Sequence, residues 1–392
     1  MKIIKVSTLT VQGNFDWLLV RVITDEGISG LGECYATRNS GQIKQYVSTL
    51  AGQIIGENPL NIARLTLKMG LGGISGHKVN AISGIEIALW DLAGKALGVP
   101  VYTLLGGNLH SKIKIYADCH AGKAVTSLKS YGGECEAYTP EAYAANAESM
   151  EKQGYQLLKF DMYPGFPGPG NRGIESPLSS ADLRYCIEIV KCVRSTLSNE
   201  TGLALDLGGS SERWWTTGDA IRLANALEPF DLDWIEDPVP GTNVEALAEV
   251  TRRTSIPVLC SYTQLRNMRQ LAREVIVKQA ARLLSIDFGN IGGLLEGKKI
   301  TDLAEQYFMP IATHNVASPI GTVAAAQASA TMPNFMALEH HAVEVPWWDS
   351  LVKNGPVIED GYYTINQRPG LGIELNEEEI RKHLKEGEEY EF

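Results

Sequence analysis

Hydrophobic and polar positions follow two different periods along the chain. Near the start, two runs rich in β-branched and apolar residues, 2–11 and 17–25, are separated by Gly13 and Asn14, which favour a turn. These runs predict a small antiparallel sheet. Apolar residues then recur at helical spacing through 81–98. The first hundred residues therefore predict an α+β unit.

From about residue 113 the pattern changes to short apolar runs separated by helical segments. Eight runs can be counted: IKIYA, LLKF, LALDL, LDWIE, PVLC, LLSID, PIATH and FMALE. Strands that alternate with helices imply right-handed βαβ units and a parallel sheet, and eight of them suggest closure into a barrel. The fold class expected is therefore α/β, a modified (β/α)8 TIM-like barrel with an N-terminal α+β capping domain.

The expected domain boundaries follow from these changes of pattern. Residues 1–112 form the capping domain and residues 113–350 form the barrel with the active site. Residues 351–392 contain a turn-rich stretch and an acidic amphipathic helix that fit no further barrel unit. We expect this C-terminal segment to pack back on the capping domain and complete it.

Composition excludes several classes of protein. The formal net charge is −11 with Lys and Arg dispersed, which argues against nucleic acid as a partner. No uncharged stretch reaches membrane-spanning length, and the first residues lack the pattern of a signal peptide. Six cysteines without a C-x-x-C pair indicate reduced thiols. We expect a cytoplasmic enzyme with a small-molecule substrate and no membrane partner.

The ends of the predicted strands carry the chemistry, because the active site of such a barrel lies at the carboxyl ends of its strands. These ends hold Lys159, Asp161, Asp206, Glu236, Asp287, His314 and Glu339. Any one of them alone could cap the helix that follows. Lys159 and Asp161, however, are two residues apart and share a face, and a buried charge without a partner is very costly.

Two pairs among these residues suggest roles. Asp206 and Glu236 offer the hard oxygen ligands that suit Mg²⁺, although two carboxylates alone are a weak signal. Asp287 and His314 come from adjacent strands, and a carboxylate on one ring nitrogen would raise the basicity of the other. A lone histidine is more often structural, but these neighbours favour a general base.

Taken together, several motifs resemble the enolase superfamily, specifically its mandelate racemase-like group, over nearly the whole chain. They are AISGIEIALWDLAGKALGVPVYTLLGG, the K-x-D of strand two, WIEDP at 234–238, DFGNIGG at 287–293 and THN at 313–315. The resemblance implies a capping domain over a modified barrel, Mg²⁺ as cofactor and a symmetric homo-oligomer.

Site roles are implied residue by residue. Asp206 and Glu236 match metal ligands, Lys159 matches the strand-two lysine, Asp287 with His314 matches the base pair, and Glu339 matches the strand-eight acid. Asp161 is expected to bind substrate. Thr263 stands where the family has a third metal-ligand glutamate, which would weaken binding of Mg²⁺.

These implied roles favour a Mg²⁺-dependent dehydratase of a sugar acid that yields a 2-keto-3-deoxy acid through an enediolate. Strand six lacks the lysine of relatives that perform cycloisomerisation or dipeptide epimerisation. Gly208 stands where several family dehydratases carry a separate acid, so His314 is expected to act as both base and acid in a syn elimination. The alternatives are a catalytically degraded homologue that binds a ligand or partner, motivated by Thr263, and, third, a racemase or epimerase of a 2-hydroxy acid.

Overall fold

The structure is a computed structural model that describes residues 1–392 apart from 72–75, 121–137, 167, 169–172, 209–213 and 262–268. Thr263 therefore lies outside the described residues. Among the described helices, none is long and apolar enough to cross a membrane.

The N-terminal part is an antiparallel sheet covered by helices. Strands β1 (Ile3–Gln12), β2 (Asp16–Thr24) and β3 (Ser29–Thr37) pair in that order. The helices are α1 (Ser40–Ile54), α2 (Ile62–Lys68), α3 (His77–Leu97) and α4 (Val101–Leu104). Helix α3 packs closely on β3. A side chain at Gly32 of β3 would place its Cβ only 2.2 Å from the carbonyl oxygen of Gly84 in α3, so the close contact requires glycine at this position.

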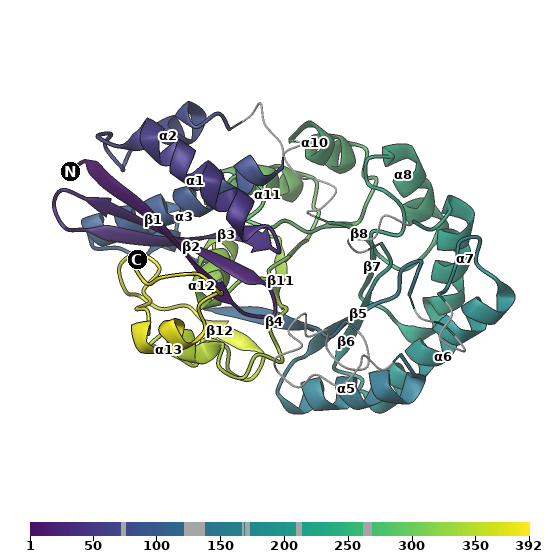
Figure 1. Ribbon diagram of the computed structural model, residues 1–392. Coiled ribbons are helices and arrows are strands. Elements are labelled where there is room, and N and C mark those ends of the chain that lie inside the picture. Colours follow the sequence, from purple (N-terminus) through teal and green to yellow (C-terminus); the bar gives the residue numbers. More distant parts are fainter. Residues whose placement is uncertain (72–75, 121–137, 167, 169–172, 209–213, 262–268) are drawn as a thin grey trace.

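A closed parallel barrel follows. Its eight strands are β4 (Lys112–Asp118), β5 (Leu157–Asp161), β6 (Gly202–Asp206), β7 (Trp234–Glu236), β8 (Val258–Cys260), β9 (Leu283–Leu284), β10 (Ile311–Thr313) and β11 (Phe335–His340). Neighbours pair in chain order, and β11 pairs with β4 to close the ring. The predicted fold class, a TIM-like barrel with an N-terminal cap, is confirmed (Figure 1).

Helices cover the outside of the barrel. They are α5 (Pro140–Lys152), α6 (Ser180–Thr196), α7 (Thr217–Leu227), α8 (Val244–Arg253), α10 (Arg269–Val277), α11 (Leu294–Gln306) and α12 (Pro319–Ser329). Short 3-10 turns lie at Glu228–Phe230 and Asp349–Leu351. Several helices begin after a side chain that accepts a hydrogen bond from the first turn: Thr139, Ser179, Thr216, Asn243 and Ser318.

The C-terminal segment contacts both halves of the molecule. Strand β12 (Tyr362–Thr364) pairs antiparallel with β4, and the short helix α13 (Glu377–Lys382) follows. Beyond α13, the backbone nitrogen of Lys385 donates to Thr10 of β1 over 3.0 Å. Figure 1 shows this yellow segment beside the purple N-terminal sheet. The domain boundaries at 112 and 350 stay our interpretation.

Two buried carboxylates of the N-terminal part hold helices of the barrel. Glu86 of α3 accepts hydrogen bonds from the backbone nitrogens of Leu294 and Leu295, the first residues of α11. Glu33 of β3 accepts from the backbone nitrogens of Ser318 and Gly321 at the start of α12. Helix N-termini carry unsatisfied donors and a partial positive charge, so these carboxylates fix the cap to the barrel.

The inside of the barrel is filled by one side chain from each strand. This apolar layer consists of Tyr116, Leu157, Ala204, Trp234, Leu259, Leu283, Ala312 and Ala337. The rings of Tyr116 and Trp234 meet edge to face with their centroids 5.4 Å apart. Because strand side chains alternate, the residue two positions further along each strand also faces inward, one step closer to the carboxyl end.

Candidate active site

That next step along the strands places a layer of polar side chains above the apolar one. The polar layer consists of Asp118, Lys159, Asp206, Glu236, Ser261, Ser285, His314 and Glu339. Two residues further on, the rim contains His120, Asp161, Gly208, Asp287 and His341. All the strand-end residues expected from the sequence and described by the structure fall in these two layers.

Lys159 lies at the centre of the polar layer. Its Nζ is 2.7 Å from Oε1 of Glu339, 3.3 Å from Oε2 of Glu236 and 3.5 Å from Oδ2 of Asp118. Burial lowers the pKa of Lys159, but these three carboxylates outweigh it and raise the pKa well above the usual value. The site therefore contains a fixed ammonium charge.

His314 and Asp287 form the pair expected from adjacent strands. The Nδ1 of His314 donates to Oδ2 of Asp287 over 2.7 Å. This bond fixes the tautomer, so Nε2 is the basic atom of the ring. Nε2 lies 3.5 Å from Oε2 of Glu339, and the ring of Tyr35 from the N-terminal sheet meets the imidazole edge to face. The geometry suits proton abstraction by Nε2.

Glu339 connects the ammonium to the histidine. It is fully buried, and its Oε2 also accepts a hydrogen bond from the backbone nitrogen of Asn315 over 2.9 Å. Burial raises the pKa of Glu339, while the positive charge of Lys159 opposes the shift. Glu339 therefore orients both Lys159 and the base.

Asp206 and Glu236 lie side by side on β6 and β7, where they are partners in the parallel register. Burial raises the pKa of Glu236 well above its usual value, and the charge of Asp206 adds to the shift although Lys159 opposes it. Two neighbouring carboxylates that disfavour each other's charge are stabilised by a bound cation. The oxygen donors of this pair thus fit a hard dication.

The helix-capping alternative does not describe these residues. Helices α5, α6, α7, α8 and α12 begin after Thr139, Ser179, Thr216, Asn243 and Ser318, and α11 begins after Gly293. Ser261, directly after β8, donates its hydroxyl to Oδ2 of Asp237. The predicted strand-end groups instead point inward and contact one another.

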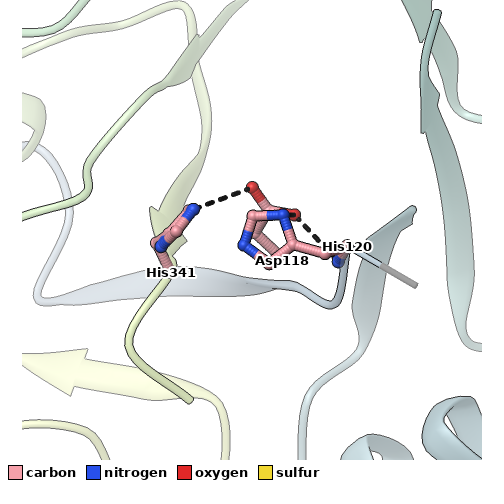
Figure 2. A group of neighbouring side chains, drawn as sticks. All are labelled: Asp118, His120 and His341. Atoms are coloured by element: carbon pink, nitrogen blue, oxygen red, sulfur yellow. Dashed lines mark hydrogen bonds and ion pairs between the residues drawn. The ribbon is translucent and has the colours of Figure 1, made fainter. Parts of the chain in front are cut away.

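Three residues of the site were not predicted from the sequence: Asp118, His120 and His341. Figure 2 shows the carboxylate of Asp118 between the two histidines, with dashed lines to His120 and to His341. The Nδ1 of His120 lies 3.8 Å from Oδ1 of Asp118 and 3.2 Å from Oδ2 of Asp161, and Nε2 of His341 lies 4.0 Å from Oδ2 of Asp118. The alternation of strand side chains could have found them. Asp118 and His120 lie two and four residues beyond the inward-facing Tyr116 of strand one, and His341 lies two residues beyond Glu339 of strand eight.

Asp118, His120 and His341 are close enough to surround one metal ion, with ligand atoms within 4.8 Å of one another. The group contains a single carboxylate, however, and Nδ1 of His120 already contacts Oδ2 of Asp161 over 3.2 Å. The amide of Asn14 also lies 2.9 Å from Nδ1 of His341, and imidazole nitrogens suit Mg²⁺ poorly. We therefore assign these three side chains to a hydrogen-bonding network.

Strand eight ends in two consecutive histidines that face opposite sides. His340 faces outward, where its ring contacts the ring of Trp348 and burial lowers its pKa to about 3. His341 shares the inward face with Glu339. Of the two histidines that follow Glu339, His341 and not His340 therefore lies at the site.

A recess with about 420 Å³ of empty volume reaches the base from the side of the N-terminal sheet. Its lining includes Glu33 and Tyr35 from that sheet together with Asp287 and His314 from the barrel. The cap and the barrel therefore both shape the space beside the imidazole.

Two family models match this chain. Residues 2–106 match the mandelate racemase / muconate lactonizing enzyme N-terminal domain, and residues 142–379 match the enolase C-terminal domain-like family. The chain belongs to the enolase superfamily, in the group of mandelate racemase and muconate lactonizing enzyme.

Individual relatives resemble the chain over almost its full length. The D-xylonate dehydratase of Haloferax volcanii is 37% identical across 99% of this chain and 90% of its own length. The D-gluconate/D-galactonate dehydratase of Picrophilus torridus is 28% identical across 95% and 89%. A solved structure of a mandelate racemase/muconate lactonizing enzyme-like protein from Rubrobacter xylanophilus is 37% identical, covers 99% of both chains and superposes with a TM-score of 0.89.

Proposed function

We propose that the chain is a hydro-lyase that dehydrates an aldonic acid to a 2-keto-3-deoxy acid. The observation that carries the proposal is the arrangement at one barrel mouth of a histidine–aspartate base, a fixed ammonium and a carboxylate pair suited to a dication. The names of the D-xylonate, D-gluconate and D-galactonate dehydratases among its relatives support the substrate class.

Mg²⁺ is the cofactor we propose, with Asp206 and Glu236 as its protein ligands among the described residues. Their oxygen donors and their mutual destabilisation, described above, are what support it. Thr263, at the position of the third ligand, stays a prediction. When bound, Mg²⁺ would stabilise the negative charge that grows on the substrate carboxylate.

His314 would take the proton from the carbon beside the carboxylate. Such a proton is too weakly acidic for an imidazole alone, so the growing negative charge needs fixed positive charge beside it. Lys159 supplies that charge within the polar layer, and Glu339 keeps the ammonium and the imidazole in place. The resulting enediolate expels the hydroxyl from the next carbon, and the enol product tautomerises to the 2-keto acid.

Dehydration fits the chain better than the reactions that use a lysine on strand six, which are cycloisomerisation and dipeptide epimerisation. It also fits better than racemisation of a 2-hydroxy acid. The inward residue at the end of strand six is Asp287, which is bonded to His314, and no lysine stands there. Strand two carries Asp161 where a second lysine would provide the opposite base of a racemase.

The homo-oligomer also stays a prediction, which sedimentation would test.

Incubation with a panel of pentonic and hexonic acids and Mg²⁺ tests the proposal. We expect 2-keto acid from some members and, in D₂O, incorporation of deuterium at the α-carbon of the remaining substrate. His314→Asn should reduce both rates by roughly 10²–10⁴-fold, the contribution credited to general base catalysis. NMR of the α-position and a 2-keto acid assay measure the two rates.

His110→Asn is a matched control, because His110 contacts the carbonyl oxygen of Met332 near the opposite end of β4. Its rates should equal those of the wild type. A folded His314→Asn protein with normal exchange would contradict the assignment of the base. Silence of the wild type across the whole panel would instead favour the degraded homologue.

A further inference from the structure

A second histidine–aspartate pair lies at the barrel mouth, on strands other than those that carry the base pair. The Nδ1 of His120 is 3.2 Å from Oδ2 of Asp161. The two residues follow β4 and end β5, the first and second barrel strands, whereas Asp287 and His314 follow the sixth and seventh. In an eight-stranded barrel the second and sixth strands face each other, so the two aspartates lie across the mouth from each other, whereas only β11 separates the strands that carry the two histidines.

The backbone holds His120 firmly in this position. Its nitrogen donates to Oδ1 of Asp118 over 3.3 Å, and its carbonyl oxygen accepts from the nitrogen of Asp161 over 2.7 Å. Its φ is 51°, in the left-handed region that costs energy for a residue other than glycine. Such strain persists at functional sites, where the surroundings fix it.

The charges around His120 keep its imidazole protonated at neutral pH. Burial lowers the pKa, but Asp118 and Asp161 outweigh burial and raise it to about 9. Lys159 opposes the shift. The ring of His341, whose centroid is 4.2 Å away, is neutral because burial lowers its pKa well below the usual value. His120 is therefore a proton donor at neutral pH and cannot be a base there.

One N–H of His120 remains available for a substrate. Nδ1 donates to Asp161, while Nε2 is buried and has no hydrogen-bond partner among the described residues. A buried N–H without a partner is costly, so a bound acceptor would relieve it.

The strand-three position where family dehydratases carry an acid has no room for one. A side chain at Gly208 would place its Cβ 2.2 Å from the carbonyl oxygen of Asp237 and 2.5 Å from the ring of Trp214. The elimination still needs a proton, because hydroxide is a poor leaving group. His120 is the charged imidazole that the described part of the mouth offers for this purpose.

We propose that His120 is the general acid that protonates the departing hydroxyl, with Asp161 as its positioning residue. This rests on the proposed dehydration and replaces the single-histidine syn elimination expected from the sequence. His314 takes the α-proton, a carbon–carbon double bond forms, the carbon–oxygen bond at the next carbon breaks, and the Nε2 proton of His120 leaves with the hydroxyl as water. His120 then regains a proton from solvent.

A substrate analogue in which fluorine replaces the departing hydroxyl separates this role from binding, since fluoride leaves without a proton. On the natural hydroxy acid, His120→Asn should lower dehydration by roughly 10²–10⁴-fold. It should retain α-deuterium exchange, which depends on His314. Release of fluoride from the 3-fluoro analogue should stay within a few-fold of the wild type. His110→Asn serves again as the control and should leave all three rates unchanged.

The outcomes distinguish the two proposals. Wild-type turnover with unimpaired dehydration by His120→Asn contradicts the acid and leaves the dehydratase intact. Equal losses of dehydration, exchange and fluoride release indicate a binding or structural role and also contradict it. A wild type that neither exchanges nor eliminates contradicts the proposed function itself.

A readout independent of turnover is the titration of His120 by ¹H–¹⁵N NMR, with the His120→Asn spectrum identifying its signals. The ring should stay protonated at pH 7 and titrate near pH 9. A ring that is neutral at pH 7 would overturn the assignment.

Discussion

The two histidine–aspartate pairs use the same residue types but lie in different surroundings. His314 is in the polar layer, one step deeper than His120 on the rim. The carboxylate beside the first, Glu339, is 2.7 Å from the ammonium of Lys159, whereas Asp118 beside the second is 3.5 Å from it. The cation therefore offsets negative charge more strongly on the base side, and Asp118 adds to Asp161 in holding a proton on His120.

The role of each imidazole is therefore set by the carboxylates that face it and by the nearest compensating cation. Lys159 contacts both sides, so it is the point at which the two roles are coupled. A change to Lys159 should affect both α-exchange and dehydration. A change to Glu33, beside the base, should alter the pH dependence of stability, and a change to Asp161, beside the acid, should alter the pH dependence of dehydration.

Among changes to the groups that support the two histidines, the largest effect should come from Lys159→Met. Loss of the ammonium removes stabilisation of the enediolate and should lower α-exchange and dehydration together by roughly 10²–10³-fold. It also leaves Glu236 and Glu339 without their cation, and breaking a buried ion pair costs roughly 3–5 kcal/mol of unfolding free energy. Exchange in D₂O and urea unfolding measure the two effects.

Lys95→Met is the control for this change, because Lys95 pairs with Asp91 within α3, away from the mouth. Both rates should be normal in the control. Loss of dehydration with normal exchange in Lys159→Met would mean that the lysine serves the acid side alone.

A smaller effect concerns Glu33, which supports the base side from the N-terminal sheet. Burial raises its pKa from 4.5 to about 7, and hydrogen bonds from Ser318 and Gly321 only partly oppose this increase. The folded state thus binds this proton more tightly than the unfolded state, so the contribution of Glu33 to stability is fully present below pH 4.5 and falls as pH rises to about 7. A tenfold change in proton affinity corresponds to about 1.4 kcal/mol, so this contribution amounts to roughly 3 kcal/mol.

Glu33→Gln cannot ionise and should therefore gain roughly 3 kcal/mol relative to the wild type between pH 4.5 and 7. Urea unfolding at a series of pH values measures the difference, and taking the difference removes the similar effect of Glu86, which both proteins retain. Glu378→Gln on the exposed face of α13 is the control and should show no such trend. A difference that does not vary with pH would contradict the assignment.

The barrel and most of the base side were predictable from the sequence because strand periodicity is strict. The apolar run LLKF followed by Asp161, or PIATH ending in His314, indicates both the strand and its inward face. The same rule applied to IKIYA yields Asp118 and His120, but a single aspartate and histidine at a strand end carry no local sign of partners. Their role depends on Asp161, which the pairing of β4 with β5 brings close, and on His341, which the closure of the ring between β11 and β4 brings close.

The periodicity of the sequence could not predict the protonation state of the histidines or the packing between distant segments. The left-handed backbone of His120, the contact of Asn14 with His341 and the lack of space at Gly208 all arise from tertiary contacts. The expectation that His314 serves as both base and acid came from the absence of an obvious acid in the sequence. Local sequence does not reveal the pKa of a histidine, since that depends on charges from other strands.

The smallest effect at neutral pH should come from Asp161→Asn, and it distinguishes the two histidines most directly. Asp161 is one of two carboxylates that raise the pKa of His120 to about 9, so its neutralisation should lower that pKa while Asp118 still supports part of the increase. A general acid must be protonated to act. On the alkaline side, dehydration by the wild type should therefore fall above about pH 9, roughly tenfold for each further pH step of one, and in the variant this fall should begin at lower pH.

Dehydration rates from about pH 6 to 10, with α-exchange followed in the same samples, provide the measurement. Asp161→Asn should differ little from the wild type at the acidic end of this range, and exchange, which His314 performs, should keep its wild-type pH dependence. Asp287→Asn is the matched change on the other side: it disturbs the tautomer of the base and should lower exchange across the whole range without moving the alkaline limit. If Asp161→Asn instead lowered both rates equally at every pH, Asp161 would serve substrate binding, and the histidine beside it would not be the acid.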